Sequence, residues 1–137
     1  MIVKDMNIPL EKLDYQFQDK PLLIGGMAME YYGLRKTGAD IDLVISSSDH
    51  ARLKQQYPHH VKDLYGDIGI CEFEFEIWNQ IARYNYEELK VGAIEEPSLL
   101  IISLEKLLFL KTLAIKHEKY YKDVLLLVEE IMKRKNS

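Results

Sequence analysis

The pattern of hydrophobic and polar positions separates a front part made of short segments from a helical last third. Apolar residues recur at helical spacing from Leu10 to Phe17, which predicts an amphipathic first helix that ends before Pro21. The run 21–24 is short and apolar and ends at two glycines, which predicts a buried strand. A brief helix is predicted next, over 27–32.

Two further segments alternate between acidic and apolar residues, which is the pattern of a β-strand with one buried face. The first runs from Asp40 to Ile45 and becomes fully apolar toward its end. The second spans 72–77 and predicts one longer strand with its acids on one face and its aromatic residues in the core. Its acids are Glu72, Glu74 and Glu76. Between the two segments, a helix of about two turns is predicted from the region of Asp49 to Pro58.

The last third of the chain is predicted to be a strand followed by two helices. Residues 98–102 have the strand pattern, and Ser103 is a suitable N-cap for a helix whose apolar positions recur up to Ala114. Residues 124–132 repeat that spacing in a final helix. This order predicts a single domain over 1–137 with an α/β (α+β) fold, in which a small mixed sheet is flanked by helices and two helices end the chain.

Length and charge limit the classes of protein that fit this pattern. The chain has 137 residues, which suits one domain with a sizeable core. Its single cysteine excludes an internal disulfide and a cysteine-based zinc finger. A net charge of −4 argues against a protein that coats nucleic acid non-specifically. Because the sequence has neither a long apolar run nor a signal-peptide pattern, we expect no membrane segment and a cytoplasmic location.

The candidate chemistry lies between the first two predicted strands. Gly25 and Gly26 follow a strand and begin a helix, where glycine lets the backbone approach a phosphate and the helix dipole favours its charge. After thirteen intervening residues, Asp40 and Asp42 lie two apart on a strand and therefore share a face. Neighbouring carboxylates repel each other unless a hard cation such as Mg²⁺ or Mn²⁺ lies between them. A phosphate cradle beside such a pair is typical of phosphoryl and nucleotidyl transfer.

At these residues the chain resembles the minimal nucleotidyltransferase superfamily, and within it the AbiEii toxin-like and toxin–antitoxin nucleotidyltransferases. The resemblance covers Ile24-Gly25-Gly26, Asp40-Ile41-Asp42 and the Arg35-Lys36-Thr37 stretch before the acidic pair. It continues with Lys111 in the helix that begins Ser-Leu-Glu, and with Lys122-Asp123 at the start of the last helix. It implies a nucleotidyltransferase-like fold and a Mg²⁺ or Mn²⁺ cofactor. The residues that it assigns to nucleotide binding are Gly25, Gly26, Arg35, Thr37 and Lys111.

The family usually adds a third carboxylate from a later strand, and this chain offers three. Because Glu72, Glu74 and Glu76 are predicted to share a face, spacing alone does not choose among them. Glu-Ile-Trp at 76–78 is similar to the family's strand signature, so the resemblance favours Glu76, with Glu74 second. The chosen acid is expected opposite Asp42, as a metal ligand or as the base for an incoming hydroxyl. The catalytic and metal-binding set is then Asp40, Asp42 and Glu76.

Each candidate also has a plainer interpretation. The acids suit a solvated strand face, and Gly25-Gly26 suits a tight turn. Arg35 and Lys111 suit ordinary surface charges, and Lys122-Asp123 suits a charge pair at a helix start. If the glycines and the aspartates share a pocket, the enzymatic interpretation is favoured over these plainer ones.

The resemblance implies Mg²⁺-dependent transfer of a nucleoside monophosphate from an NTP to a hydroxyl. The acceptor is either an RNA 3′ end or a tyrosine or serine of a partner protein, in a toxin–antitoxin or phage-defence system. Two alternatives stay open. One is a non-catalytic module of the same fold that binds a nucleotide or a partner. The other is an interaction protein from a two-gene operon, whose exposed apolar helix faces form a dimer.

Overall fold

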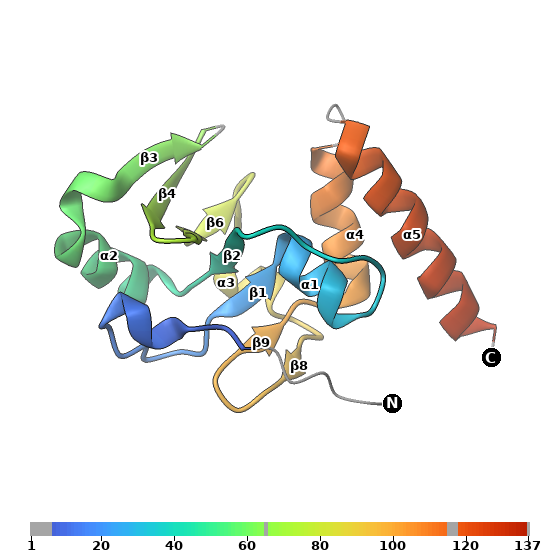
Figure 1. The fold of residues 1–137 in the computed structure, drawn as a ribbon, viewed down its shortest axis with the longest axis horizontal. Helices are drawn as coiled ribbons and strands as arrows, with labels where there is room; N and C mark the ends of the chain where they lie inside the picture. Colours follow the sequence, from blue (N-terminus) through green and yellow to red (C-terminus); the bar gives the residue numbers. More distant parts are fainter. Residues whose placement is uncertain (1–6, 65, 115–117, 137) are drawn as a thin grey trace.

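A computed structural model describes residues 7–64, 66–114 and 118–136, and its central feature is a mixed β-sheet (Figure 1). Within these residues the sheet has seven strands in the order β3-β4-β5-β2-β1-β9-β8. β1 is parallel to β9 and β2 is parallel to β5, and the other neighbours are antiparallel. The strands are β1 (Leu22–Ile24), β2 (Ile41–Val44), β3 (Val61–Leu64), β4 (Asp67–Glu72), β5 (Phe75–Trp78), β8 (Ile94–Glu95) and β9 (Leu100–Ile101).

Helices cover both faces of this sheet. A second, two-stranded sheet is the hairpin of β6 (Gln80–Ile81) and β7 (Tyr84–Asn85). The helices are η1 (Leu10–Leu13), α1 (Gly25–Tyr31), α2 (Ser47–Gln56), η2 (Pro58–His60), α3 (Tyr86–Leu89), α4 (Leu104–Leu113) and α5 (Glu118–Lys135). Figure 1 shows α4 and α5 side by side, at the opposite end of the molecule from β3 and β4. The predicted mixed α/β fold with two C-terminal helices is confirmed. In the described part of the chain, no helix combines the length and the apolar character needed to cross a membrane.

Each face of the sheet has its own hydrophobic core. On one face, η1 and α2 pack against the sheet, and the buried residues there include Leu13, Leu43, Leu53, Phe75 and Ile77. On the other face, α1, α3, α4 and α5 pack against it through residues such as Met29, Leu89, Leu107 and Leu127. The predicted cap of α4 is confirmed, because the Ser103 side chain accepts a hydrogen bond from the backbone N–H of Lys106.

The predicted first helix is wrong beyond its first turn. η1 ends at Leu13 and is followed by Asp14, which has a left-handed backbone with φ of 47°. The chain then becomes extended, and the Tyr15 hydroxyl donates a hydrogen bond to the carboxylate of Asp49 at 2.7 Å. Two following backbone N–H groups donate to the same buried carboxylate. The stabilisation from these tertiary hydrogen bonds outweighs the local preference for a helix that the spacing of the apolar residues indicates.

The predicted longer strand is in fact two strands, β4 and β5, joined by a two-residue turn at Phe73 and Glu74. Phe73 has a positive φ of 52° and is 60% exposed, so it does not lie in the core. Glu72 is the register partner of Phe75. Because register partners share a face, Glu72 lies on the face of Phe75 and opposite to Glu76. The three glutamates therefore do not share a face.

Candidate functional site

A cleft of about 1210 Å³ lies between the sheet and the C-terminal helices α4 and α5. It is lined by every residue of the favoured set, in which Glu76 is the third acid. These residues come from separate stretches of the chain: the start of α1, the loop before β2, then β2, β5 and α4. These residues are Gly25, Gly26, Arg35, Thr37, Asp40, Asp42, Glu76 and Lys111. The glycine turn and the aspartates therefore share one pocket.

Two carboxyl groups lie next to each other at the floor of this cleft. Asp42 on β2 is the register partner of Glu76 on the parallel strand β5, so both side chains point to the same face of the sheet. Glu76 thus has the position expected for the third acid, and its role stays a prediction. The other two glutamates lie elsewhere, because Glu74 pairs with Lys12 and Glu72 pairs with His60.

Burial and crowding strongly change the acidity of Asp42. Its Oδ1 atom is buried and lacks a hydrogen-bond partner among the described residues. Burial, followed by a hydrogen bond to the carboxyl group of Glu76 and the charge of that group, raises the pKa of Asp42 to about 7. The charge of Lys111 opposes this rise. A proton or a cation would therefore be held more readily here than at an ordinary surface carboxylate.

The start of α1 lies directly against this acid. Gly25 has a left-handed φ of +65°, and a Cβ atom placed on it would overlap Oδ2 of Asp42. A Cβ atom on Gly26 would lie 2.5 Å from Oγ1 of Thr37. Both glycines are therefore required by close approach, which excludes a plain turn that any residue could form. Thr37 is fixed in turn, because its N–H donates to Oε1 of Glu30 at 3.1 Å.

Gly25→Ala should lower the free energy of unfolding by about 2–4 kcal/mol, because alanine resists the positive φ and its Cβ displaces the Asp42 carboxylate. Gly33→Ala is the matched control. Gly33 has a φ of +73° with no other atom within 4 Å of a Cβ, so it reports the backbone cost alone, about 1 kcal/mol. Urea unfolding measures both. Equal losses in the two variants would show that Gly25 and Asp42 are not in close contact.

A second cluster of charges lies on the α-helical wall of the cleft. Asp123 on α5 is 2% exposed, and its carboxylate accepts hydrogen bonds from Nε and Nη2 of Arg35 at 2.6 and 2.8 Å. Nζ of Lys111 on α4 lies 2.8 Å from the same carboxylate. Lys111 is therefore not the ordinary surface lysine of the plainer interpretation, since its side chain is only 7% exposed. From the sequence, Asp123 is predicted only as one member of the Lys122-Asp123 pair at the start of the last helix.

The ionisation of this cluster follows from its contacts. Burial by itself raises the pKa of Asp123, but hydrogen bonds from Arg35 and Lys111 outweigh it and hold the pKa below its ordinary value. Burial lowers the pKa of Lys111, and the hydrogen bond to Asp123 opposes that effect. Asp123 therefore stays ionised at neutral pH between two cations.

The acidic side chains can be tested for their fit to a divalent cation. Across the described ranges, no three His, Cys, Asp or Glu side chains gather closely enough to hold an ion by themselves. Asp40 precedes β2 and is exposed at the cleft, whereas Asp42 and Glu76 are adjacent. An adjacent pair with a buried, unpartnered oxygen suits Mg²⁺, which proteins usually bind through one or two carboxylates together with water and substrate phosphates. The acids thus fit the cation when water and substrate oxygens complete its ligands.

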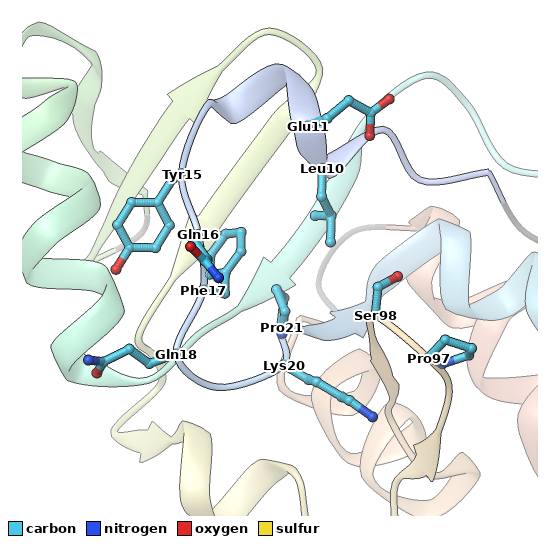
Figure 2. Close-up of a pocket in the computed structure, with 10 residues that line it drawn as sticks. All are labelled: Leu10, Glu11, Tyr15, Gln16, Phe17, Gln18, Lys20, Pro21, Pro97 and Ser98. Atoms are coloured by element: carbon cyan, nitrogen blue, oxygen red, sulfur yellow. The ribbon is translucent and has the colours of Figure 1, made fainter.

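A second pocket, of about 350 Å³, lies between η1, the segment before β1 and the turn before β9 (Figure 2). Its charged lining side chains are Glu11 and Lys20. Nζ of Lys20 is already bound to the backbone oxygen of Glu96 at 2.9 Å. The candidate site residues all lie in the larger cleft, so we assign no chemistry to this pocket.

Comparison with known proteins gave no match to a protein-family model, to a curated protein or to a solved structure.

Proposed function

We propose that this chain is a Mg²⁺-dependent nucleotidyltransferase, as implied by its resemblance to the AbiEii-like and toxin–antitoxin branch of the minimal nucleotidyltransferase superfamily. It would transfer a nucleoside monophosphate from an NTP to a hydroxyl group. The observation that supports this most is the convergence on one cleft of residues from five separate stretches of the chain. Solvated strand acids, a plain turn and scattered surface cations would not need to meet in one place.

In this proposal the acids and the glycines act at the triphosphate. Gly25 and Gly26 leave the backbone open to close approach by phosphate oxygens. Asp42 and Glu76, with Asp40 at the rim, would hold Mg²⁺, which when bound neutralises charge on the transferred phosphoryl group. Glu76 either ligates the cation or accepts the proton of the attacking hydroxyl, since it lies beside Asp42 at the cleft floor.

The cations of the cleft would stabilise the negative charge of the nucleotide. Arg35 and Lys111 are both held by Asp123, and both line the cleft. The side chain of Arg35 is 34% exposed, whereas that of Lys111 is nearly buried. Arg35 is therefore the cation that an entering phosphate meets first, and Lys111 adds charge from behind it. Asp123 is a positioning residue in this arrangement.

The size and lining of the cleft favour a second reactant beside the nucleotide. Its volume of about 1210 Å³ exceeds the roughly 300–1,000 Å³ of a pocket for one small ligand. Away from the acids, its walls are apolar and include Trp78, Ile81 and Leu110. The net charge of −4 favours a protein acceptor over RNA. We therefore place a hydroxyl of a partner protein, encoded in the same operon, ahead of an RNA 3′ end.

Transfer of label tests this proposal directly. The protein is incubated with Mg²⁺ and each NTP, labelled at the α-phosphate, together with total tRNA or the protein encoded by a neighbouring gene. We expect transfer with at least one NTP and loss of transfer in Asp42→Ala. Glu74→Ala is the control, because this acid lies outside the cleft and should leave transfer unchanged. Transfer that survives Asp42→Ala, or the absence of transfer with every NTP and both acceptors, would contradict the proposal.

A second candidate is a module of the same fold that binds a nucleotide without turnover. It is favoured by the full pairing of Asp123 with both cations, which leaves them partly neutralised. In that case NTP with Mn²⁺ raises the melting temperature of the protein while no labelled product forms. The enzyme instead gives both the thermal shift and the product.

A further inference from the structure

The last helix carries a second apolar face that the fold leaves uncovered. One face of α5 packs into the domain through Leu127, which is fully buried. A different set of apolar side chains on the same helix is between 42% and 53% exposed. This set, named here the α5 seam, is Tyr121, Leu125, Val128 and Met132.

The α5 seam is a continuous row of side chains. Its members are spaced by four, three and four residues, which is the spacing of the core positions of a coiled coil. At about 100° per residue, this spacing places all four side chains along one narrow stripe of the helix. Single exposed apolar residues are common on soluble proteins, but a row at this spacing is typical of a helix that packs against another helix.

We propose that the α5 seam binds the same seam of a second copy of this chain, with the two helices antiparallel across a two-fold axis. In a two-fold interface the same surface of both copies meets, so each seam residue must find a suitable partner in the seam of the second copy. Pairing Leu125 with Val128 of the second copy also pairs Tyr121 with Met132 of the second copy. Every seam residue then has an apolar partner, and each pair occurs twice.

The charged residues beside the seam agree with this arrangement. Lys122 and Glu129 are exposed and flank the stripe on the same side. In the antiparallel register, Lys122 lies beside Glu129 of the second copy, offset along the helix by two residues or about 3 Å. A parallel pair would instead place these charges toward the half-buried Val124 and Ile131. Opposite charges on one flank therefore select the antiparallel second copy as the occupant.

The expected dimer is a weak one that lies beside the cleft. Four seam residues and two flanking charges from each copy make an interface below the standard size, so dissociation in the micromolar range is expected. Lys122 also lines the cleft. The second copy would therefore lie along the rim of the cleft. This inference does not depend on the proposed transfer activity, since it concerns the outer side of α5.

Sedimentation velocity over a range from roughly 1 to 300 µM tests the interface. We expect a concentration-dependent change from monomer to dimer in the wild type, and a dissociation constant raised about 100-fold or more by Leu125→Glu, next to the two-fold axis. Val91→Glu is the control. It adds the same charge at an apolar residue that is 63% exposed and lies outside α5, and it should dimerise as the wild type does. A monomer at every concentration, or a dimer unaffected by Leu125→Glu, would overturn the proposal.

Charge exchange tests the register separately. Lys122→Glu and Glu129→Lys should each weaken the dimer about fivefold at low salt, because each creates two like-charge contacts across the symmetric interface. The double variant should return to within about twofold of the wild type. If the double variant stays as weak as the single ones, the antiparallel register is wrong. Because both residues are exposed, circular dichroism should show unchanged helix content in all three variants.

Discussion

Asp123→Asn is expected to lower the free energy of unfolding by about 3–5 kcal/mol, measured by urea unfolding followed by circular dichroism. Asparagine keeps the shape of the side chain but removes the charge that compensates Arg35 and Lys111. The nearly buried Lys111 and the partly exposed Arg35 are then left without their counter-charge. Removing one partner of a buried ion cluster costs far more stability than the whole cluster contributes. The Nζ of Lys111 is the most affected, since its side chain is 7% exposed.

The stability that Asp123→Asn loses depends on pH. The pKa of Asp123 is lower in the folded protein than its ordinary value of 3.8. Its stabilising contribution is therefore fully present above that ordinary value and is lost as the pH falls through the folded pKa. The difference between wild type and Asp123→Asn should shrink only in strong acid.

Glu130→Gln is the matched control for Asp123→Asn, because it removes a carboxylate from an ion pair on the same helix. That pair, with Arg134 at 2.7 Å, lies at the surface, and the Arg134 side chain is 43% exposed. Its loss should cost less than about 0.5 kcal/mol. Similar effects of the two substitutions would mean that the cluster around Asp123 does not stabilise the contact between α4, α5 and the loop before β2.

Asp42→Asn should raise the stability of the protein, whereas Asp123→Asn lowers it, and it should abolish the proposed nucleotide transfer. The variant removes an acid whose charge is disfavoured by burial and by Glu76, and the new amide can donate a hydrogen bond to that carboxylate. At pH 8 we expect the free energy of unfolding to rise by about 2 kcal/mol. A stabilising substitution that removes activity is the signature of a group kept for function.

The pH profile of this effect distinguishes it from general repacking. The pKa of Asp42 rises from 3.8 in the unfolded chain to about 7 in the folded protein. Between these values the unfolded chain loses its proton while the folded protein keeps it, so the stability of the wild type falls as the pH rises from about 4 to about 7. The advantage of Asp42→Asn should therefore be small at pH 4 and complete at pH 8. A constant advantage across this range would show that the charge of Asp42 is not its cause.

The elements that the sequence predicts correctly are those with strong local signals. The Gly-Gly turn between β1 and α1, the aspartates at β2 and the Ser103 cap all depend on neighbours within a few positions. The small elements after β5 also had a local signal, because Asn85 and Glu88 form the capping box that starts α3. The helix has only four residues, too few for a helical repeat of apolar positions to accompany the capping box.

The hairpin between β4 and β5 lacked such a signal. Phe73 and Glu74 are not the residues that usually form two-residue turns, and they continue the alternation of the flanking strands. The sequence therefore reads as a single strand. What decides the structure is the parallel pairing of β5 with β2, which places Glu76 beside Asp42 and which spacing within one segment does not reveal.

The anchoring role of Asp123 also could not be predicted from spacing. Its contact with Arg35 joins positions 88 residues apart, and the Lys122-Asp123 pair suits an ordinary helix start equally well. Only the packing of α5 against α4 buries the carboxylate and turns a common dipeptide into the centre of an ion cluster.

The same cluster affects how the cleft would respond to an anion. Long basic side chains lose about 2 kcal/mol of rotamer entropy each when they are immobilised. In this protein Asp123 restrains Arg35 and Lys111 during folding, before any ligand arrives. A phosphate would therefore meet a preorganised pair of cations. The entropy of these side chains is lost on folding, so it lowers the stability of the fold and does not weaken the binding of the phosphate.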